Sequence, residues 1–128
     1  MPQDRESGKR ANEYGRKTAK RIAKEIGAIC ISKTSNEFRL KNRKITIRCA
    51  HYRTNDVGMS YKMLERIDAV IAAFEQKNGQ YKLYEISPQS FKQNMRETKS
   101  KGPAAGKVRL VRKSFFTNEG KLISIIKL

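Results

Sequence analysis

The hydrophobic residues of this chain follow two periods, one typical of helices and one typical of strands. The stretch NEYGRKTAKRIAKEIG, residues 12–27, has the helical period, with Asn12 as a candidate cap and Gly27 as a candidate end. One face of this predicted helix is apolar or small, and it consists of Gly15, Ala19, Ile22, Ala23 and Ile26. The opposite face consists of Lys17, Lys20, Arg21 and Lys24. We expect the helix to bury the first face and to present positive charge on the second.

Short alternating runs after this helix predict three strands, AICIS (28–32), NEFRL (36–40) and KITIRCA (44–50). The polar link between the last two runs contains Asn42, which favours a tight hairpin turn. A polar loop, HYRTNDVG, follows at 51–58. We therefore expect an antiparallel unit that begins directly after the helix.

The second half of the chain predicts more strands and two helices. SYKMLERI (60–67) has helical spacing, DAVIAAFEQ (68–76) predicts a strand buried on both faces, and Asn78-Gly79 predicts a hairpin to QYKLYEIS (80–87). Ser87 and Pro88 are typical of the start of a helix, predicted over 87–99. A basic loop, 99–107, precedes two more strands, predicted at 108–116 and 121–128 around a turn at 118–120.

This order of elements predicts a mixed α/β domain built on one central sheet. The elements run α-β-β-β-α-β and then β-α-β-β, without an internal repeat. A chain of 128 residues is long enough for one domain with a modest core and too short for two. We expect a single domain over 12–128, preceded by a mobile polar arm at 1–11.

The charge is strongly positive and points to a polyanionic partner. Lys and Arg outnumber Asp and Glu 29 to 12, for a formal net charge of +17. A compact domain with this charge repels itself, which a bound nucleic acid would relieve. No apolar run approaches the length of a membrane span or a signal peptide, so we expect a cytoplasmic protein without a membrane partner.

The two cysteines, Cys30 and Cys49, and the single histidine, His51, are too few for a structural zinc site. Both cysteines lie in apolar strand patterns, which is typical of buried free thiols in a reducing compartment. A Cys49–His51 catalytic pair lacks a third member and an oxyanion hole.

The order α-β-β-β-α-β, in a basic chain, resembles the PD-(D/E)XK nuclease superfamily of restriction enzymes, Holliday-junction resolvases and small intron-encoded endonucleases. Asn36-Glu37 stands where that family has Pro-Asp, and Thr46-Ile47-Arg48 stands where it has (D/E)-x-K. The stretch RIDAVIAAFEQKNGQYKLYEISP is similar to the intron-endonuclease branch, and the resemblance covers residues 12–88. It implies a restriction-endonuclease-like αβββαβ core with an added C-terminal hairpin.

The resemblance also implies a metal-dependent DNA endonuclease. Glu37 and Glu25, or less readily Glu13, would hold Mg²⁺ or Mn²⁺, because Mg²⁺ prefers hard oxygen ligands. Arg48 would face the scissile phosphate as a cation that is not a base. Thr46 cannot replace a metal-binding carboxylate, although its hydroxyl could hold a metal-bound water.

A second placement of the same motif uses Asp68 and Glu85, which are predicted at one end of a hairpin, with Ser87 in place of the lysine. The alternative for each acid is structural: Glu37 pairs with a nearby cation, Asp68 caps a turn, and Glu85 pairs across its hairpin with a lysine.

The predicted DNA contacts lie in the helix at 12–27, the loop at 51–55 and the segment 99–113. Those residues are Lys17, Lys20, Arg21, Lys24, Arg53, Lys101, Lys107, Arg112 and Lys113. Aromatic neighbours in HYRT and VRKSFF could stack on bases, although the phenylalanines also suit a core. We expect a homodimer on duplex or branched DNA. The alternatives are a non-catalytic nucleic-acid-binding protein with a degenerate nuclease site and an RNA-processing nuclease on the same scaffold.

Overall fold

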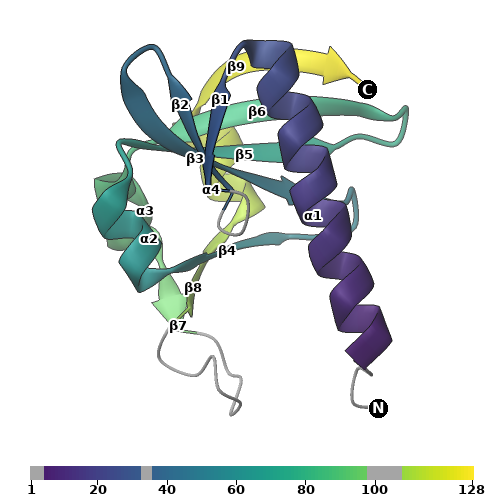
Figure 1. The fold of residues 1–128 in the computed structure, drawn as a ribbon. Coiled ribbons are helices and arrows are strands. Elements are labelled where there is room, and N and C mark those ends of the chain that lie inside the picture. The colour runs from purple at the N-terminus through teal and green to yellow at the C-terminus, as the bar shows by residue number, and fades with distance from the viewer. Residues whose placement is uncertain (1–4, 33–35, 98–107) are drawn as a thin grey trace.

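A computed structural model describes residues 5–32, 36–97 and 108–128 as three layers (Figure 1). A six-stranded sheet is the middle layer. Helix α1 (Arg5–Ile26) covers one face of it. The other face is covered by a three-stranded sheet and by three short helices, α2 (Tyr61–Arg66), α3 (Pro88–Asn94) and α4 (Lys113–Glu119). This confirms the mixed α/β class.

The central sheet has the strand order β1-β2-β3-β5-β6-β9. Its strands are β1 (Ile29–Ser32), β2 (Glu37–Leu40), β3 (Arg43–Ala50), β5 (Ala69–Glu75), β6 (Gln80–Ile86) and β9 (Lys121–Lys127). β3 and β5 run parallel, and the other neighbours are antiparallel. The smaller sheet has the order β4-β8-β7, from β4 (Asp56–Ser60), β8 (Val108–Arg112) and β7 (Arg96–Glu97). The parallel pair brings the loop after β3 and the turn after β5 to the same end of the molecule.

Helix α1 begins earlier than the sequence pattern predicts. It starts at Arg5, so residues 5–11, predicted as an arm, are helical, and residues 1–4 lie outside the described residues. Ala19, Ile22 and Ala23 are buried against the central sheet, as predicted from their spacing. Gly27 ends the helix with φ of 80°, a left-handed conformation that glycine adopts without steric cost.

Two predicted hairpins are confirmed by their turn geometry. Lys41 and Asn42 have φ of 52° and 66° between β2 and β3, which is the pair of positive angles that a tight two-residue turn requires. Gly79, with φ of 86°, joins β5 to β6.

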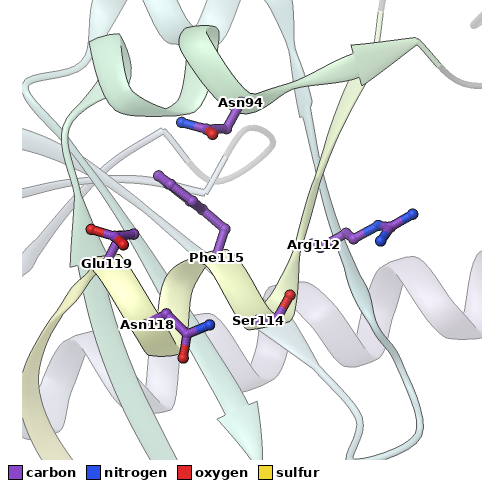
Figure 2. A pocket seen from close by; sticks show the side chains of 6 residues that line it. All are labelled: Asn94, Arg112, Ser114, Phe115, Asn118 and Glu119. Carbon is purple, nitrogen blue, oxygen red and sulfur yellow. The ribbon is translucent and has the colours of Figure 1, made fainter.

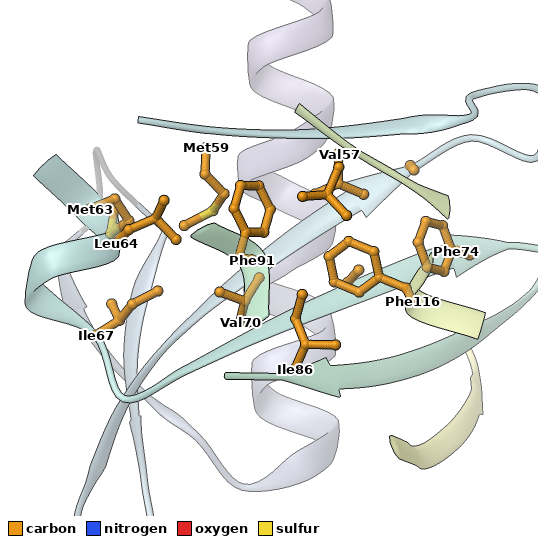
Figure 3. Close-up of a cluster of buried hydrophobic side chains, with 13 residues drawn as sticks. Val57, Met59, Met63, Leu64, Ile67, Val70, Phe74, Ile86, Phe91 and Phe116 are labelled. Atoms are coloured by element: carbon orange, nitrogen blue, oxygen red, sulfur yellow. The ribbon is translucent and has the colours of Figure 1, made fainter. Parts of the chain in front are cut away.

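The two faces of β5 belong to two different cores, which is why this strand is apolar throughout. Ile71 and Ala73 pack with α1, and Val70, Ala72 and Phe74 pack with the second layer. Figure 3 shows the second core, where Phe74, Phe91 and Phe116 meet between the layers. The ring centroids of Phe74 and Phe116 lie 5.7 Å apart in an edge-to-face arrangement.

The prediction of one central sheet with a C-terminal hairpin is wrong. β8 pairs with β4 in the smaller sheet, β9 pairs with β6 in the larger one, and α4 lies between them. β4 was predicted as part of a loop, and the helix predicted over 87–99 ends at Asn94. Local alternation identifies a strand but not the sheet that it joins, and Phe115–Phe116 suits a strand or a helix equally. Within the described residues, no helix has the length and apolar character to cross a membrane.

Candidate functional site

Glu37, Thr46 and Arg48 share one face of the central sheet, as the family resemblance implies. Glu37 on β2 is the register partner of Thr46 on β3, and Arg48 follows two residues later. Side chains two apart on a strand point to the same face. This face is the one that carries Ala50 and packs against the second layer, whereas Ile45 and Ile47 face α1.

The groups on this face are already engaged within the protein. Nε and Nη2 of Arg66, from α2, donate to Oε1 of Glu37 at 2.9 and 2.8 Å. The Thr46 side chain is fully buried, and its hydroxyl donates to the carbonyl oxygen of Asn36 at 3.0 Å. The hydroxyl has no solvent-exposed surface from which it could contact a metal-bound water. In the structure Glu37 pairs with a nearby cation, which is the structural alternative considered for it.

Arg48 lies beneath β4 and is largely removed from solvent. Its Nε donates to Sδ of Met59 at 3.3 Å, and among the described residues no carboxylate lies within 4 Å of its guanidinium. Burial lowers the pKa of Arg48 from its usual value, although a guanidinium stays charged at neutral pH. Burial also raises the pKa of the neighbouring Cys49 thiol to about 12, so this thiol stays protonated. The predicted burial of both cysteines holds only in part, since Cys30 is exposed.

The structure does not bring Glu25 to Glu37. Glu25 is near the end of α1, on the opposite side of the central sheet, where it lines a hollow of ≈ 450 Å³ with Arg43, Glu85 and Lys121. Glu13 is also in α1, and nothing is described of its side chain. The proposed pair of metal ligands is therefore divided between the two faces of the sheet.

The alternative pair, Asp68 and Glu85, is engaged as well. Oδ2 of Asp68 accepts the backbone N–H of Lys44 at 2.9 Å, which is the capping role considered for it. Nη2 of Arg43 donates to Oε1 of Glu85 at 2.8 Å, so Glu85 pairs across the sheet with an arginine instead of a lysine. No three acidic, histidine or cysteine side chains gather for a metal within 5–32, 36–97 and 108–128. These donors, as arranged, do not fit Mg²⁺, which takes several free oxygens.

The structural role of Thr46 leads to a stability prediction. We expect Thr46→Val to lower the free energy of unfolding by about 1–2 kcal/mol, because the fully buried Thr46 hydroxyl is lost and the part-buried Asn36 carbonyl keeps only the backbone N–H of Ile47 as a donor. The matched control is Thr117→Val, which removes an exposed hydroxyl bonded to the Ser114 carbonyl at 3.1 Å and should change stability by less than about 0.5 kcal/mol. Urea denaturation of both variants measures the difference, and equal effects would contradict this role.

Five of the nine predicted DNA contacts, with Lys77 in addition, gather in another place, at the end of the molecule where β3 and β5 finish. We call this surface the basic end and define it by Lys17, Arg21, Arg53, Lys77, Arg112 and Lys113. Three neighbouring hollows of ≈ 410, 440 and 330 Å³ run across it. Glu75 lines the first and the second, and Lys113 lines the second and the third. The hollows therefore follow one another around the end of the sheet.

A fourth hollow, of ≈ 400 Å³, continues from the basic end between α3 and α4 (Figure 2). Arg112 lines both this hollow and the third one. Phe115 projects from α4 toward Asn94 on α3, with Ser114 and Asn118 beside it. Beyond Arg112, this hollow therefore presents amide and hydroxyl groups together with the carboxylate of Glu119.

The six cations of the basic end form no ion pair with a described carboxylate, although Glu75 lines two of the hollows beside them. Within the described part of the chain, no carboxylate lies within 4 Å of any of the six. Lys20 and Lys24 are also exposed on α1 but do not line these hollows. Lys101 and Lys107 lie outside the described residues.

Glu75 is the acid within this surface, and it holds the loop after β3. Its carboxylate accepts from Nδ1 of His51 at 3.3 Å, from the Tyr81 hydroxyl at 3.2 Å and from the backbone N–H of Tyr52. The backbone N–H of Lys113 donates to the Asn55 carbonyl at 2.7 Å and anchors the other end of the loop. The loop is therefore attached both to β5 and to α4.

Acid should loosen this attachment. Burial acts to raise the pKa of Glu75, but the hydrogen bonds from His51, Tyr81 and the Tyr52 backbone together lower it. A lowered pKa adds stability that is present above the unfolded value of about 4.5 and is lost as pH falls through the folded value. We expect wild type to exceed Glu75→Gln in stability at neutral pH, and the gap to close below about pH 4.5. Urea midpoints across pH measure the gap, and a constant gap would contradict the assignment.

Two functional candidates were missed from the sequence. Lys77 reaches the basic end because the Asn78-Gly79 turn places it beside Tyr52, and a basic residue in that turn was a usable signal. Arg66 was read as part of a short helix, and its pairing with Glu37 depends on how α2 packs over the sheet.

Comparison with known proteins found no relative of this chain. No model of a known family matches it, and neither a curated protein nor a solved structure is detectably similar. The resemblance to PD-(D/E)XK nucleases stays a prediction that depends on Glu37, Thr46 and Arg48. The features of the structure that bear on function are the basic end and the face of the sheet that carries Glu37.

Proposed function

We propose that this protein is a non-catalytic binding module for nucleic acid, DNA foremost, which holds the phosphate backbone against the basic end and the outer face of α1. The observation that carries the proposal is the row of six cations without a carboxylate partner among the described residues. Unpaired cations at this density favour a polyanion, since their mutual repulsion is relieved when phosphates approach.

The strength of such binding follows from counterion release. Each phosphate neutralised by Lys or Arg frees a condensed cation, so affinity falls steeply as salt rises. Six contacts correspond to a slope of roughly −5 in a plot of log K against log salt for duplex DNA. Nucleic acid would approach α1 on its outward side, where Lys20 and Lys24 add to the field.

The test is a fluorescence anisotropy titration of the whole chain with labelled duplex DNA at several salt concentrations. We expect binding at low salt and a slope near the value above. Absence of binding at low salt, or a slope near zero, would reject the proposal.

A second candidate is a metal-dependent DNA endonuclease centred on Glu37 and Arg48. The observation that favours it is that these two side chains share a face on the adjacent strands β2 and β3. The elements before β5, the strand parallel to β3, are ordered α-β-β-β-β-α, so β4 is added to the order that the resemblance implies. The residues present would bind and orient a phosphodiester through Arg48 and Arg66. The Glu37–Arg66 ion pair would have to open first.

This candidate predicts nicking of plasmid or four-way-junction DNA with Mg²⁺ or Mn²⁺. Glu37→Ala should abolish cutting and leave binding intact. Glu65→Ala, which removes an exposed acid on α2, should change neither cutting nor binding. Persistent cutting by Glu37→Ala would reject Glu37 as the catalytic residue. If wild type cuts DNA with neither metal, the endonuclease candidate is rejected and only the binding module remains.

We propose the same partners for either candidate: DNA first and RNA second, bound by a homodimer in the cytoplasm. A domain of this size that reads a two-fold DNA site does so as a pair of identical copies. Sedimentation of the complex with duplex DNA would show two chains per site if this holds and one chain per site if it does not.

A further inference from the structure

Tyr52 stands apart from the other exposed hydrophobic side chains. Its exposed fraction is 41%, and it is the one aromatic residue among the large exposed hydrophobics of the described residues. The others lie on the edge strands β1 and β9: Ile29, Ile31, Leu122 and Ile125. Tyr52 is in the loop after β3, inside the basic end.

The position of Tyr52 is held firmly by the loop around it. Glu75 accepts its backbone N–H, and the backbone N–H of Thr54 donates to the His51 carbonyl at 2.9 Å. The guanidinium of Arg53 lies 5.4 Å from the centroid of the tyrosine ring and covers part of it. A ring presented on an anchored loop loses little conformational entropy when a ligand packs on it.

The surroundings of the ring suit a nucleobase joined to phosphates. Tyr52 lines the ≈ 440 Å³ hollow with two cations, Lys77 and Lys113. The other lining residues are Gln76, Asn78 and Glu75, whose carboxylate is held by the loop and by Tyr81. Nζ of Lys113 lies 5.4 Å from the centroid of the buried Phe74 ring, a cation–π contact that helps to position this cation. A hollow within the usual range of about 300–1,000 Å³ admits a planar group.

Base stacking on a protein ring requires a base that is free of its own stack. In a duplex, both faces of each base are covered by neighbours, and a side chain reaches only the edges. Proteins that bind single strands combine a basic groove with aromatic platforms, which is the combination at the basic end. A site that binds only phosphates would require the cations but no exposed aromatic ring.

We propose that the basic end binds an unpaired segment of a nucleic-acid strand, with one base stacked on Tyr52 and the flanking phosphates held by Lys77, Lys113 and Arg21. This inference rests on the proposed nucleic-acid binding and names its substrate class. The chemistry is common to DNA and RNA, since both supply a stackable base between phosphates.

The test compares Tyr52→Ala with Tyr52→Phe, which keeps the ring. Wild type and both variants are titrated by anisotropy with oligo-dT and oligo-rU of about 12 nucleotides, and with duplex DNA. We expect Tyr52→Ala to lose about tenfold in affinity for the single strands and to bind duplex within about twofold of wild type. Tyr52→Phe should bind all three as wild type does. The slope against salt should not change, because no charge is removed.

A second measurement reports on the stack itself. The chain has no tryptophan, so Tyr52→Trp introduces a single indole at this position. Its fluorescence should be quenched by oligo-dT or oligo-rU and much less by duplex. The oligonucleotide that binds with higher affinity shows whether the preferred strand is DNA or RNA.

The two proposals fail in different ways. If wild type binds no nucleic acid at low salt, the proposed function itself is rejected. If wild type binds but Tyr52→Ala binds single strands as wild type does, or loses duplex affinity equally, the stacking role is overturned and the binding module survives.

Discussion

Replacing Lys17, Arg21, Lys77 and Lys113 together by glutamine is expected to lower affinity for nucleic acid roughly 1,000-fold. Each of these side chains is available for a charge-assisted contact with phosphate, and four contacts at about 1 kcal/mol each give this factor. Glutamine keeps much of the side-chain length and removes the charge. The plot of log K against log salt on duplex DNA should also become less steep, by about 3.6 in slope.

The control for this variant removes four charges elsewhere. Exposed lysines Lys41, Lys44, Lys62 and Lys121 lie on other elements, away from the basic end. Their combined replacement by glutamine lowers the net charge equally but should weaken binding by less than about tenfold, because distant charges are screened within about a Debye length. Equal losses from the two sets would mean that net charge, and not the basic end, determines binding.

The second large effect is expected in the core between the two layers. Phe74→Ala should lower the free energy of unfolding by about 3–5 kcal/mol, because a fully buried ring is removed where neighbours cannot close the space. Phe116 lies 5.7 Å and Tyr84 6.1 Å from the Phe74 ring, centroid to centroid. The loss is a large part of the total stability of about 5–15 kcal/mol that is typical of a domain.

Chemical denaturation of Phe74→Ala, followed by circular dichroism, measures this loss. Leu122→Ala provides the comparison, since Leu122 is 46% exposed on the edge strand β9 and its truncation should cost less than about 0.5 kcal/mol. Similar midpoints for the two variants would contradict the two-layer core. Phe74 also supports Lys113 from below, so a folded Phe74→Ala protein should bind nucleic acid less tightly than wild type.

The candidate sites were predictable to different degrees. The outward cations of α1 follow from helical period alone, and Lys17 and Arg21 lie where that period predicts. The shared face of Glu37 and Arg48 follows from the period of a hairpin with a two-residue turn. The separation of Glu25 from Glu37 was not predictable, because it depends on which face of the sheet α1 covers.

The sequence by itself determined the local elements and their exposed faces. Hydrophobic period, Asn42, Gly79 and the Ser87-Pro88 start are local signals, and they act through backbone dihedrals and neighbouring side chains. Only the tertiary structure decided that β8 and β9 join different sheets, that β4 covers Arg48 and that Arg66 neutralises Glu37. These are contacts between residues far apart in the chain, and their free energy depends on packing and burial, which no local pattern contains.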